Sequence, residues 1–218
     1  MHKSVRLVAA AVLFTTAGFA TDFPKYETYL GYDFVRFNTN SGYIPNFNAN
    51  GGGGQFVYNF NKWIGAAVDL GAVTKGTLGG YSVDTTVFSF MAGPRFTWWH
   101  HDSRFKPFVQ ALFGGAYSTI SSQITVSPSV SQPIYPPGLV VPPGLPISAR
   151  LVASHTGFAM VAGGGLDIKL SKYAYIRPFE ADYFLTRMPN LDYVSSGGHS
   201  NLNNFRYSCG VNFVFGKM

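Results

Sequence analysis

The sequence predicts an all-β fold, an eight-stranded antiparallel transmembrane up-and-down β-barrel, and three observations support this prediction. The first is the C-terminal segment from Phe205 to Phe215, where every second residue is apolar and most residues between are polar or small. A period of two is typical of a strand with one apolar and one polar face. The second is the composition, with 12% charged and 17% aromatic residues, which suits a barrel with an apolar outer band and aromatic girdles. The third is an alternation of long and short connections between the expected strands.

The first four expected strands show this alternation along the N-terminal half of the chain. They cover residues 29–37, 54–60, 63–73 and 85–97. The first two set leucine and aromatic residues against a polar face that carries Asp33, Gln55 and Asn59. The third and fourth set aliphatic residues and phenylalanines against a face that carries Asp69 and Arg95. The polar faces are expected to line the barrel lumen, because lipid-facing and lumen-facing residues alternate in such strands.

The last four expected strands complete the barrel and contain one irregularity. They cover residues 107–117, 157–170, 173–186 and 205–215. Strict alternation in the seventh strand places Arg177 on the face opposite to Glu180 and Asp182. Pro178 cannot donate a hydrogen bond to a neighbouring strand, and such positions often hold a β-bulge. We therefore expect a bulge that turns Arg177 into the lumen.

The connections predict which end of the barrel faces the periplasm. Long connections are expected at residues 38–53, 74–84, 119–154 and 187–203, and shorter ones at residues 61–62, 98–106 and 171–172. Barrels of this class have short periplasmic turns and longer outer loops. Aromatic residues gather beside the short turns, which predicts a periplasmic girdle formed by Trp63, Trp98, Trp99, Tyr173 and Tyr175.

The N-terminus has the layout of a secretory signal peptide. A basic start, an apolar run at Leu7–Phe14 and small residues up to Ala20 predict a signal peptide over residues 1–20, which leaves residues 21–218 as the barrel. The apolar run is too short for a membrane-spanning helix, which needs about 20 residues. The only cysteine is Cys209, so a disulfide framework is not expected.

Short motifs indicate the kind of barrel. They are Leu30-Gly31-Tyr32, Asn61-Lys62-Trp63-Ile64-Gly65 with Asp69, Ala92-Gly93-Pro94-Arg95-Phe96, and Asn204-Phe205-Arg206 to Phe215-Gly216. In these motifs and their order, nearly all of the mature chain resembles the small OmpA-type outer-membrane barrels, a group that includes opacity-like proteins. The resemblance implies a bacterial outer-membrane location, reached by secretion through the inner membrane and cleavage of the signal peptide. It also implies contact with outer-membrane lipid, lipopolysaccharide and the barrel-assembly machinery. The periplasmic peptidoglycan-binding domain of full-length members has no counterpart here.

The inward positions predict a charge network in the lumen. Its members are Asp33, Asp69, Arg95, Asp167, Glu180, Asp182 and Arg206. An eight-stranded barrel is just wide enough for side chains to fill it, and unpaired buried charges are costly. Arg95 and Arg206 are therefore expected to bridge at least one acid each, with Lys169, Arg177 or water as further partners. Two interpretations stay open, a polar plug and a gated narrow pore.

The expected loop at residues 119–156 is the most distinctive surface feature. It holds seven prolines and repeats Pro-Pro-Gly-Leu at residues 136–139 and 142–145, which favours an extended conformation with exposed backbone. Its contact candidates are Tyr135, Leu139, Val140, Val141 and Leu145. Long loops on rigid scaffolds often carry function, so partner binding is one interpretation. The alternative is a loop that merely tolerates insertion.

The sequence predicts no enzyme, cofactor, metal site or nucleic-acid partner. His199-Ser200-Asn201 is similar to the His-x-Ser-Asn pattern of lipid A deacylases, but adjacent strand residues point to opposite faces, and a nucleophile needs its base within reach. His100-His101 and the lone His155 lack the ligand set of a metal site. The net charge of +6 is scattered rather than clustered.

The function expected from these features is that of a structural membrane anchor that displays surface loops for adhesion or partner binding. The alternative is a narrow porin-like channel for ions or small solutes. An outer-leaflet lipid A hydrolase is a remote third hypothesis.

Overall fold

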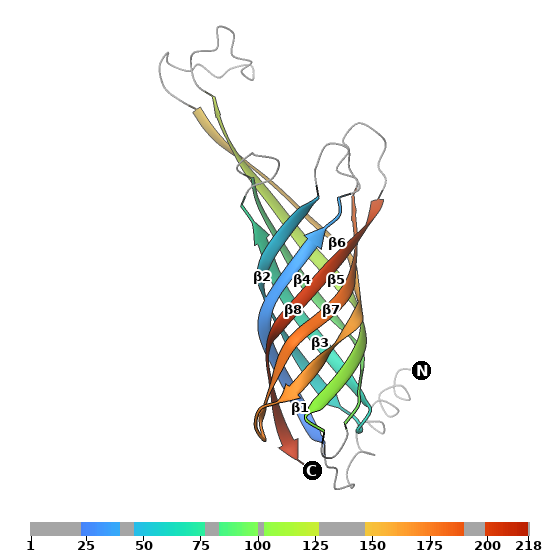
Figure 1. Ribbon diagram of the computed structural model, residues 1–218. Coiled ribbons are helices and arrows are strands. Elements are labelled where there is room, and N and C mark those ends of the chain that lie inside the picture. The colour runs from blue at the N-terminus through green and yellow to red at the C-terminus, as the bar shows by residue number, and fades with distance from the viewer. Residues whose placement is uncertain are drawn as a thin grey trace, which may run out of the picture.

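The computed structural model describes residues 23–39, 46–76, 83–99, 103–126, 147–189 and 199–217. These residues form a closed barrel of eight antiparallel strands in sequence order, with β1 next to β8, which confirms the predicted fold class (Figure 1). The strands are β1 (Pro24–Phe37), β2 (Phe47–Asn59), β3 (Ile64–Lys75), β4 (Val83–Thr97), β5 (Phe105–Val126), β6 (Ile147–Lys169), β7 (Ala174–Pro189) and β8 (His199–Lys217). The expected signal peptide lies outside the described residues. No helix long and apolar enough to cross a membrane occurs within the ranges given above.

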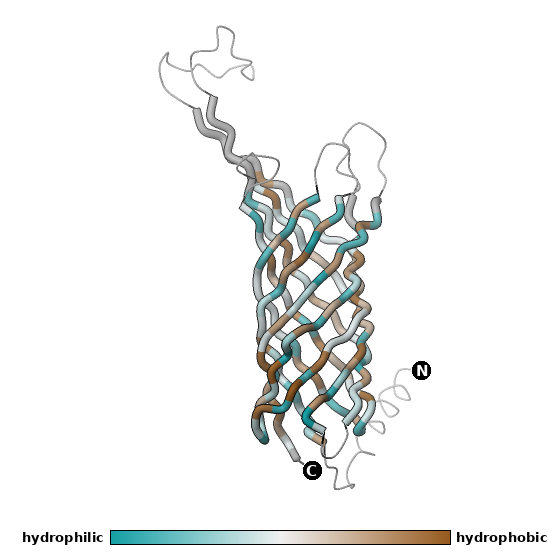
Figure 2. The backbone as a smooth tube through the Cα atoms, in the orientation of Figure 1, coloured by the Kyte–Doolittle hydropathy of each residue, from teal (hydrophilic) through white to brown (hydrophobic). Residues whose placement is uncertain are grey.

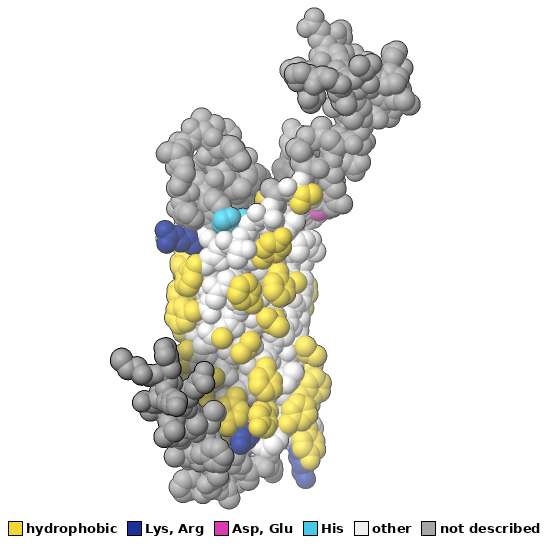
Figure 3. Space-filling view, turned by 180° about the vertical axis from the view of Figure 1, so that it is seen from behind, with side chains coloured by type: hydrophobic (Ala, Val, Ile, Leu, Met, Phe, Trp, Pro, Cys, Tyr) yellow, Lys and Arg dark blue, Asp and Glu magenta, His cyan; other side chains and the backbone are white. Residues whose placement is uncertain are grey.

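Side chains along each strand point alternately outward and into the lumen. The outward side chains are mainly apolar, and the inward ones are mainly polar in the half of the barrel that carries the buried charges. In β1, the side chains of Leu30 and Tyr32 are exposed on the outside, whereas Asp33 is buried in the lumen. Figure 2 shows the same alternation of hydropathy along the strands. In the space-filling view, apolar side chains cover the outer wall, and the basic side chains on this face lie near its ends (Figure 3). The wall therefore has the band of exposed apolar side chains expected of a membrane barrel.

The short connections lie at one end of the barrel, which we call the turn end. After β2, Asn61 Oδ1 accepts hydrogen bonds from the backbone N–H groups of Trp63 and Ile64, at 2.8 and 2.9 Å. After β6, Ser171 Oγ accepts the N–H groups of Tyr173 and Ala174 at 3.2 and 3.1 Å. Asn and Ser favour tight turns because their side chains can replace a backbone acceptor in this way. The opposite end is called the loop end.

All four expected loops are shorter than predicted, because strands continue into them, and the loop at residues 74–84 is shortened only slightly. β2 begins at Phe47 rather than at residue 54, and β8 begins at His199 rather than at residue 205. β5 continues to Val126 and β6 already begins at Ile147, so the predicted bounds of the 119–156 loop are wrong at both ends. The loop prediction failed because Gly and Asn, which are depleted in strands, are abundant in the added parts of β2 and β8, and Ser is abundant in those of β5 and β6. Pairing with neighbouring strands outweighs this preference.

The glycine run at residues 51–54 shows how pairing with neighbouring strands can hold glycines in a strand. Glycine weakens an isolated strand, yet here β1 and β3 pair with the run from both sides. A Cβ atom at Gly51 would collide with the Ala72 carbonyl oxygen, and one at Gly53 would collide with the Asp33 carboxylate. The glycines therefore allow a close approach of backbone and lumen side chains inside the sheet.

β5 and β6 extend well beyond the other strands. They contain 22 and 23 residues, whereas β1 to β4 contain 12 to 15. They pair with each other along their whole length, but the pairing of β6 with β7 stops at Phe158 and Arg187. The hairpin formed by residues 119–126 and 147–157, which we call the β5–β6 arm, leans away from the barrel beyond the loop end (Figure 1).

Candidate functional site in the barrel lumen and on the β5–β6 arm

Arg177 occupies the centre of a buried charge network in the half of the lumen near the turn end. The pairing of β7 with β8 shifts register between Arg177 and Glu180, which is the bulge expected at Pro178. The Arg177 side chain is 0% exposed. Its Nε and Nη2 donate to the two oxygens of Asp167 at 2.7 and 3.1 Å, and its Nη1 donates to Glu180 Oε2 at 2.6 Å. The bulge therefore turns Arg177 inward and supplies two charge-assisted contacts.

Arg95 joins this network from β4. Its Nη2 lies 3.1 Å from Asp167 Oδ2 and 3.7 Å from Glu27 Oε2, and its Nη1 donates to Gln55 Oε1 at 2.6 Å. The sequence reasoning missed Glu27, because the first strand was expected to begin only at Tyr29. Glu27 precedes Asp33 by an even number of positions, so alternation would have placed both side chains on the inward face.

Arg206 connects the acids that lie further from the turn end. Its Nη1 donates to Asp69 Oδ1 at 2.8 Å, and its Nε donates to Asp182 Oδ2 at 2.9 Å. Its Nη2 also lies 3.6 Å from Glu180 Oε1, so Glu180 links the two arginine clusters. Asp33 accepts a hydrogen bond from Ser208 and completes the set of seven predicted residues, all of which are buried.

Amide side chains and aromatic rings fill the space between the charges. Gln110 accepts from Gln55 at 2.9 Å and donates to Glu180 at 2.7 Å. The guanidinium carbon of Arg95 lies 3.7 Å from the centre of the Phe108 ring, and that of Arg177 lies 4.1 Å from the Tyr29 ring. Such contacts are favourable for a desolvated cation. The arrangement can therefore act as a packed polar plug.

Acids outnumber bases in the network. Its carboxylates are Glu27, Asp33, Asp69, Asp167, Glu180 and Asp182, and its guanidiniums are Arg95, Arg177 and Arg206. The expected role of Lys169 is wrong, because this side chain is exposed. One oxygen, Asp182 Oδ1, finds no hydrogen-bond partner among the described residues. Each guanidinium is consequently shared by two or more carboxylates.

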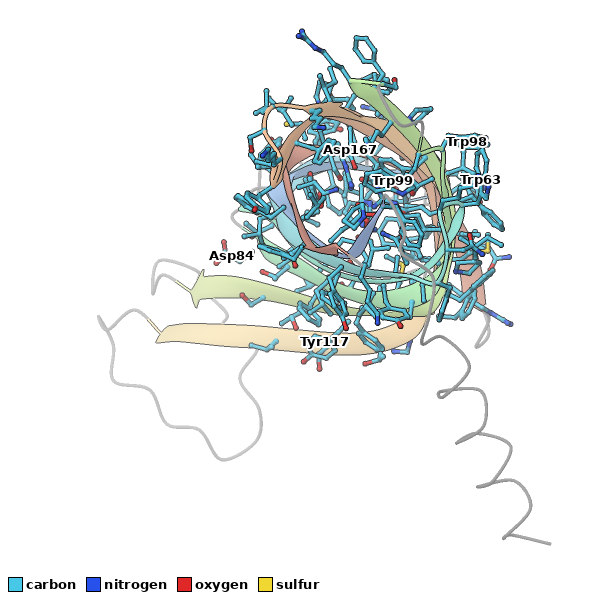
Figure 4. The ribbon with its side chains drawn as sticks, turned by 90° about the horizontal axis from the view of Figure 1, so that it is seen from below. Trp63, Asp84, Trp98, Trp99, Tyr117 and Asp167 are labelled. Carbon is cyan, nitrogen blue, oxygen red and sulfur yellow. The ribbon has the colours of Figure 1, made fainter. Side chains whose placement is uncertain are left out.

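The turn end of the lumen is covered by aromatic side chains and a lysine. Lys106 Nζ lies 3.5 Å from the centre of a Trp99 ring and 5.1 Å from that of Tyr175. Figure 4 shows Trp99 within the ring of strands and Trp63 and Trp98 outside it. The predicted girdle is thus wrong for Trp99 and Tyr175, which cover the lumen. Trp99 continues the inward alternation of Arg95 and Thr97 beyond the end of β4, and Tyr175 lies on the inward face of β7.

An apolar cluster lies in the half of the lumen near the loop end, beside buried polar residues such as Asn204 and Thr186, and the sequence reasoning did not predict it. Phe37 stacks on Phe47 with ring centres 5.0 Å apart and meets the edge of Phe184 at 6.4 Å. Other buried members of the same cluster are Val35, Ala49, Val73, Val87, Ala116 and Ala159. The sequence could have indicated this cluster, because Val35 and Phe37 follow Asp33 at every second position and so lie on the same inward face. The lumen is therefore filled by a polar layer and an apolar layer.

The arm presents an open strand edge. Among the described residues, β6 pairs only with β5 from Gly157 up to Ile147, so its other edge carries unpaired backbone donors and acceptors. The predicted contact residues Tyr135, Leu139, Val140, Val141 and Leu145 lie outside the described residues. Such an edge is a template for an added strand.

The structure places the serine and two of the histidines considered above within strands. His199, Ser200 and Asn201 belong to β8, and their backbones pair with Pro189, Met188 and Arg187 of β7. His155 lies in β6 rather than in a loop, and His100-His101 falls outside the described residues. No group of His, Cys, Asp or Glu side chains within the described ranges is arranged to hold a metal ion.

The fold is that of the small outer-membrane β-barrels. No protein-family model and no curated protein sequence matches the chain. Among solved structures, the chain is similar to Ail, the attachment invasion locus protein of Yersinia pestis, with a TM-score of 0.50 and 16% identity over 88% of this chain and 99% of Ail. It is also similar to neisserial surface protein A, with a TM-score of 0.52 and 13% identity over 88% of this chain and 97% of that protein.

Proposed function

We propose that the chain is an outer-membrane protein with a closed lumen that holds the β5–β6 arm outside the cell for contact with a partner. The arm is the observation that carries this proposal, because β5 and β6 extend far beyond the barrel wall and β6 keeps one edge open. The turn end would face the periplasm and the loop end would face outward. The proposal assigns no reaction, cofactor or metal to the barrel.

The chemistry of the arm favours a partner that supplies an extended backbone segment. An open edge offers main-chain hydrogen bonds, and neighbouring side chains give specificity. No Asp or Glu occurs between Phe105 and Leu166, so the arm has no negative charge that would repel an acidic partner. The candidates Tyr135, Leu139, Val140, Val141 and Leu145 would add apolar contact. Such use of the fold is consistent with its similarity to Ail, an attachment invasion locus protein.

Removal of the arm tip tests the display function. Replacing residues 127–146 by Asn-Gly joins the last pair of the hairpin, Val126 and Ile147, by a favoured two-residue turn. We expect the barrel to fold and adhesion to fall by roughly tenfold, equivalent to about 1.4 kcal/mol of binding free energy. The measurement is adhesion of bacteria that carry each variant to cultured epithelial cells, with folding checked by the heat-dependent gel shift. Unchanged adhesion by the folded variant would argue against contact through the tip.

Conductance tests whether the lumen is closed. Refolded wild-type protein in a planar bilayer should show no discrete openings, because the charge network and the apolar layer both fill the lumen. The same recording with the Arg95→Gln variant serves as a comparison. Discrete wild-type openings whose size changes in that variant would favour the narrow channel over the closed anchor.

A further inference from the structure

A hollow of about 400 Å³ lies at the foot of the arm, where β6 separates from β7. Its lining residues are His155, Thr156, Gly157, Phe158 and Arg187. Phe158 and Arg187 are the last residues of β6 and β7 that pair with each other. The hollow therefore lies at the point where β6 loses its partner β7. Its volume falls in the usual range of small-ligand sites, about 300–1,000 Å³.

The hollow sits where the outer wall changes from apolar to polar. Towards the turn end, Phe158, Tyr183 and Phe205 are 48%, 45% and 47% exposed. Towards the loop end, the next exposed residues are polar, Thr156 and Ser154 on β6, Arg187 on β7 and Asn203 on β8, and an apolar residue, Val152, is exposed again only further along the arm. In a membrane barrel, this change marks the level of the lipid headgroups.

Arg187 is available to a ligand. It is exposed and makes no hydrogen bond or ion pair with any described residue, whereas Arg177 and Arg206 in the lumen each bind carboxylates. No carboxylate competes from the adjacent strand, since β6 carries no acid before Asp167. A guanidinium offers five donors in a planar fork that matches phosphate oxygens. It is also weakly hydrated, so it gives up water readily.

We propose that this hollow binds the phosphate group of a membrane-lipid headgroup. Arg187 would donate to the phosphate oxygens. Phe158 would pack against the apolar part of the lipid just below. The inference rests on the proposed placement in the outer membrane, and it assigns a lipid contact to one named site rather than to the wall as a whole.

The test is lipid binding to the refolded full-length barrel in detergent micelles, measured by native mass spectrometry with bis-phosphorylated lipid A as the probe. Arg187→Gln should weaken binding by about tenfold or more, the usual effect of losing a charge-assisted hydrogen bond. The matched control is Arg36→Gln, an exposed arginine near the loop end of β1, which should bind as the wild type does. Lipid A without its phosphates should bind wild-type protein about as weakly as the intact probe binds Arg187→Gln.

Three results would overturn the proposal. One is unchanged binding by Arg187→Gln that shows the heat-dependent gel shift of a folded barrel. Another is an equal loss in Arg36→Gln, which would indicate general attraction to positive charge. The third is displacement of the lipid by inorganic phosphate at matching concentration, which would identify a free-anion site. The arm-tip deletion keeps all five lining residues, so it should lose adhesion and retain the lipid, which separates this inference from the display function.

Discussion

Replacing Arg177 by Met should lower the free energy of unfolding by about 3–5 kcal/mol, because two buried carboxylates lose their nearest cation and Arg95 and Arg206 are already shared with other acids. Arg177 is 0% exposed and makes hydrogen bonds of 2.6 and 2.7 Å to Glu180 and Asp167. Neither acid can reach water without opening the lumen. The measurement is urea unfolding of the barrel in lipid vesicles, followed by tryptophan fluorescence.

Two further variants make this experiment decisive. Arg36→Met removes an exposed arginine whose one hydrogen bond within the described residues is to Asn48 Oδ1, at 3.3 Å, so we expect a loss of about 1 kcal/mol or less. The triple variant Arg177→Met, Asp167→Asn, Glu180→Gln should recover at least half of the stability, because both carboxylates that bound Arg177 are then neutral, while Arg95 keeps Glu27 and Arg206 keeps Asp69. If Arg177→Met unfolds within about 1 kcal/mol of the wild type, the lumen is hydrated rather than plugged.

Replacing Phe184 by Ala should cost about 3–5 kcal/mol, as expected for removal of a buried aromatic side chain. Phe184 is 2% exposed and packs against Phe37 in the apolar layer of the lumen. The loss combines the transfer energy of the ring with a cavity that the rigid barrel cannot collapse. Unfolding of the variant in the same vesicles measures the effect.

Phe179→Ala is the matched control for the apolar layer. Phe179 lies on the same strand, β7, but points outward and is 45% exposed. We expect it to lose about 1–2 kcal/mol, since lipid fills the space that the ring leaves and only the transfer term remains. Equal losses in the two variants would contradict a packed apolar layer inside the barrel.

Alternation in the sequence was sufficient to place the predicted charges. Asp33, Asp69 and Arg206 fall on the inward face because a strand exposes alternate residues to opposite sides, whichever neighbours it pairs with. Even Arg177 could be predicted, because Pro178 indicated the bulge that the register shift shows. The closed eight-stranded fold followed from the number of such segments and their connections.

The tertiary structure alone decided where strands end and which charges meet. β5 and β6 continue to Val126 and Ile147 because each is the other's partner, and the Ser- and Thr-rich sequence does not indicate that pairing. Arg206 and Asp69, which form an ion pair, are 137 positions apart in the chain, so only closure of the barrel brings them within 2.8 Å. Alternation fixes the side of the wall on which a residue lies, because it is local. Contacts across the lumen and the open edge of the arm depend on strand register and tilt, which are properties of the closed barrel.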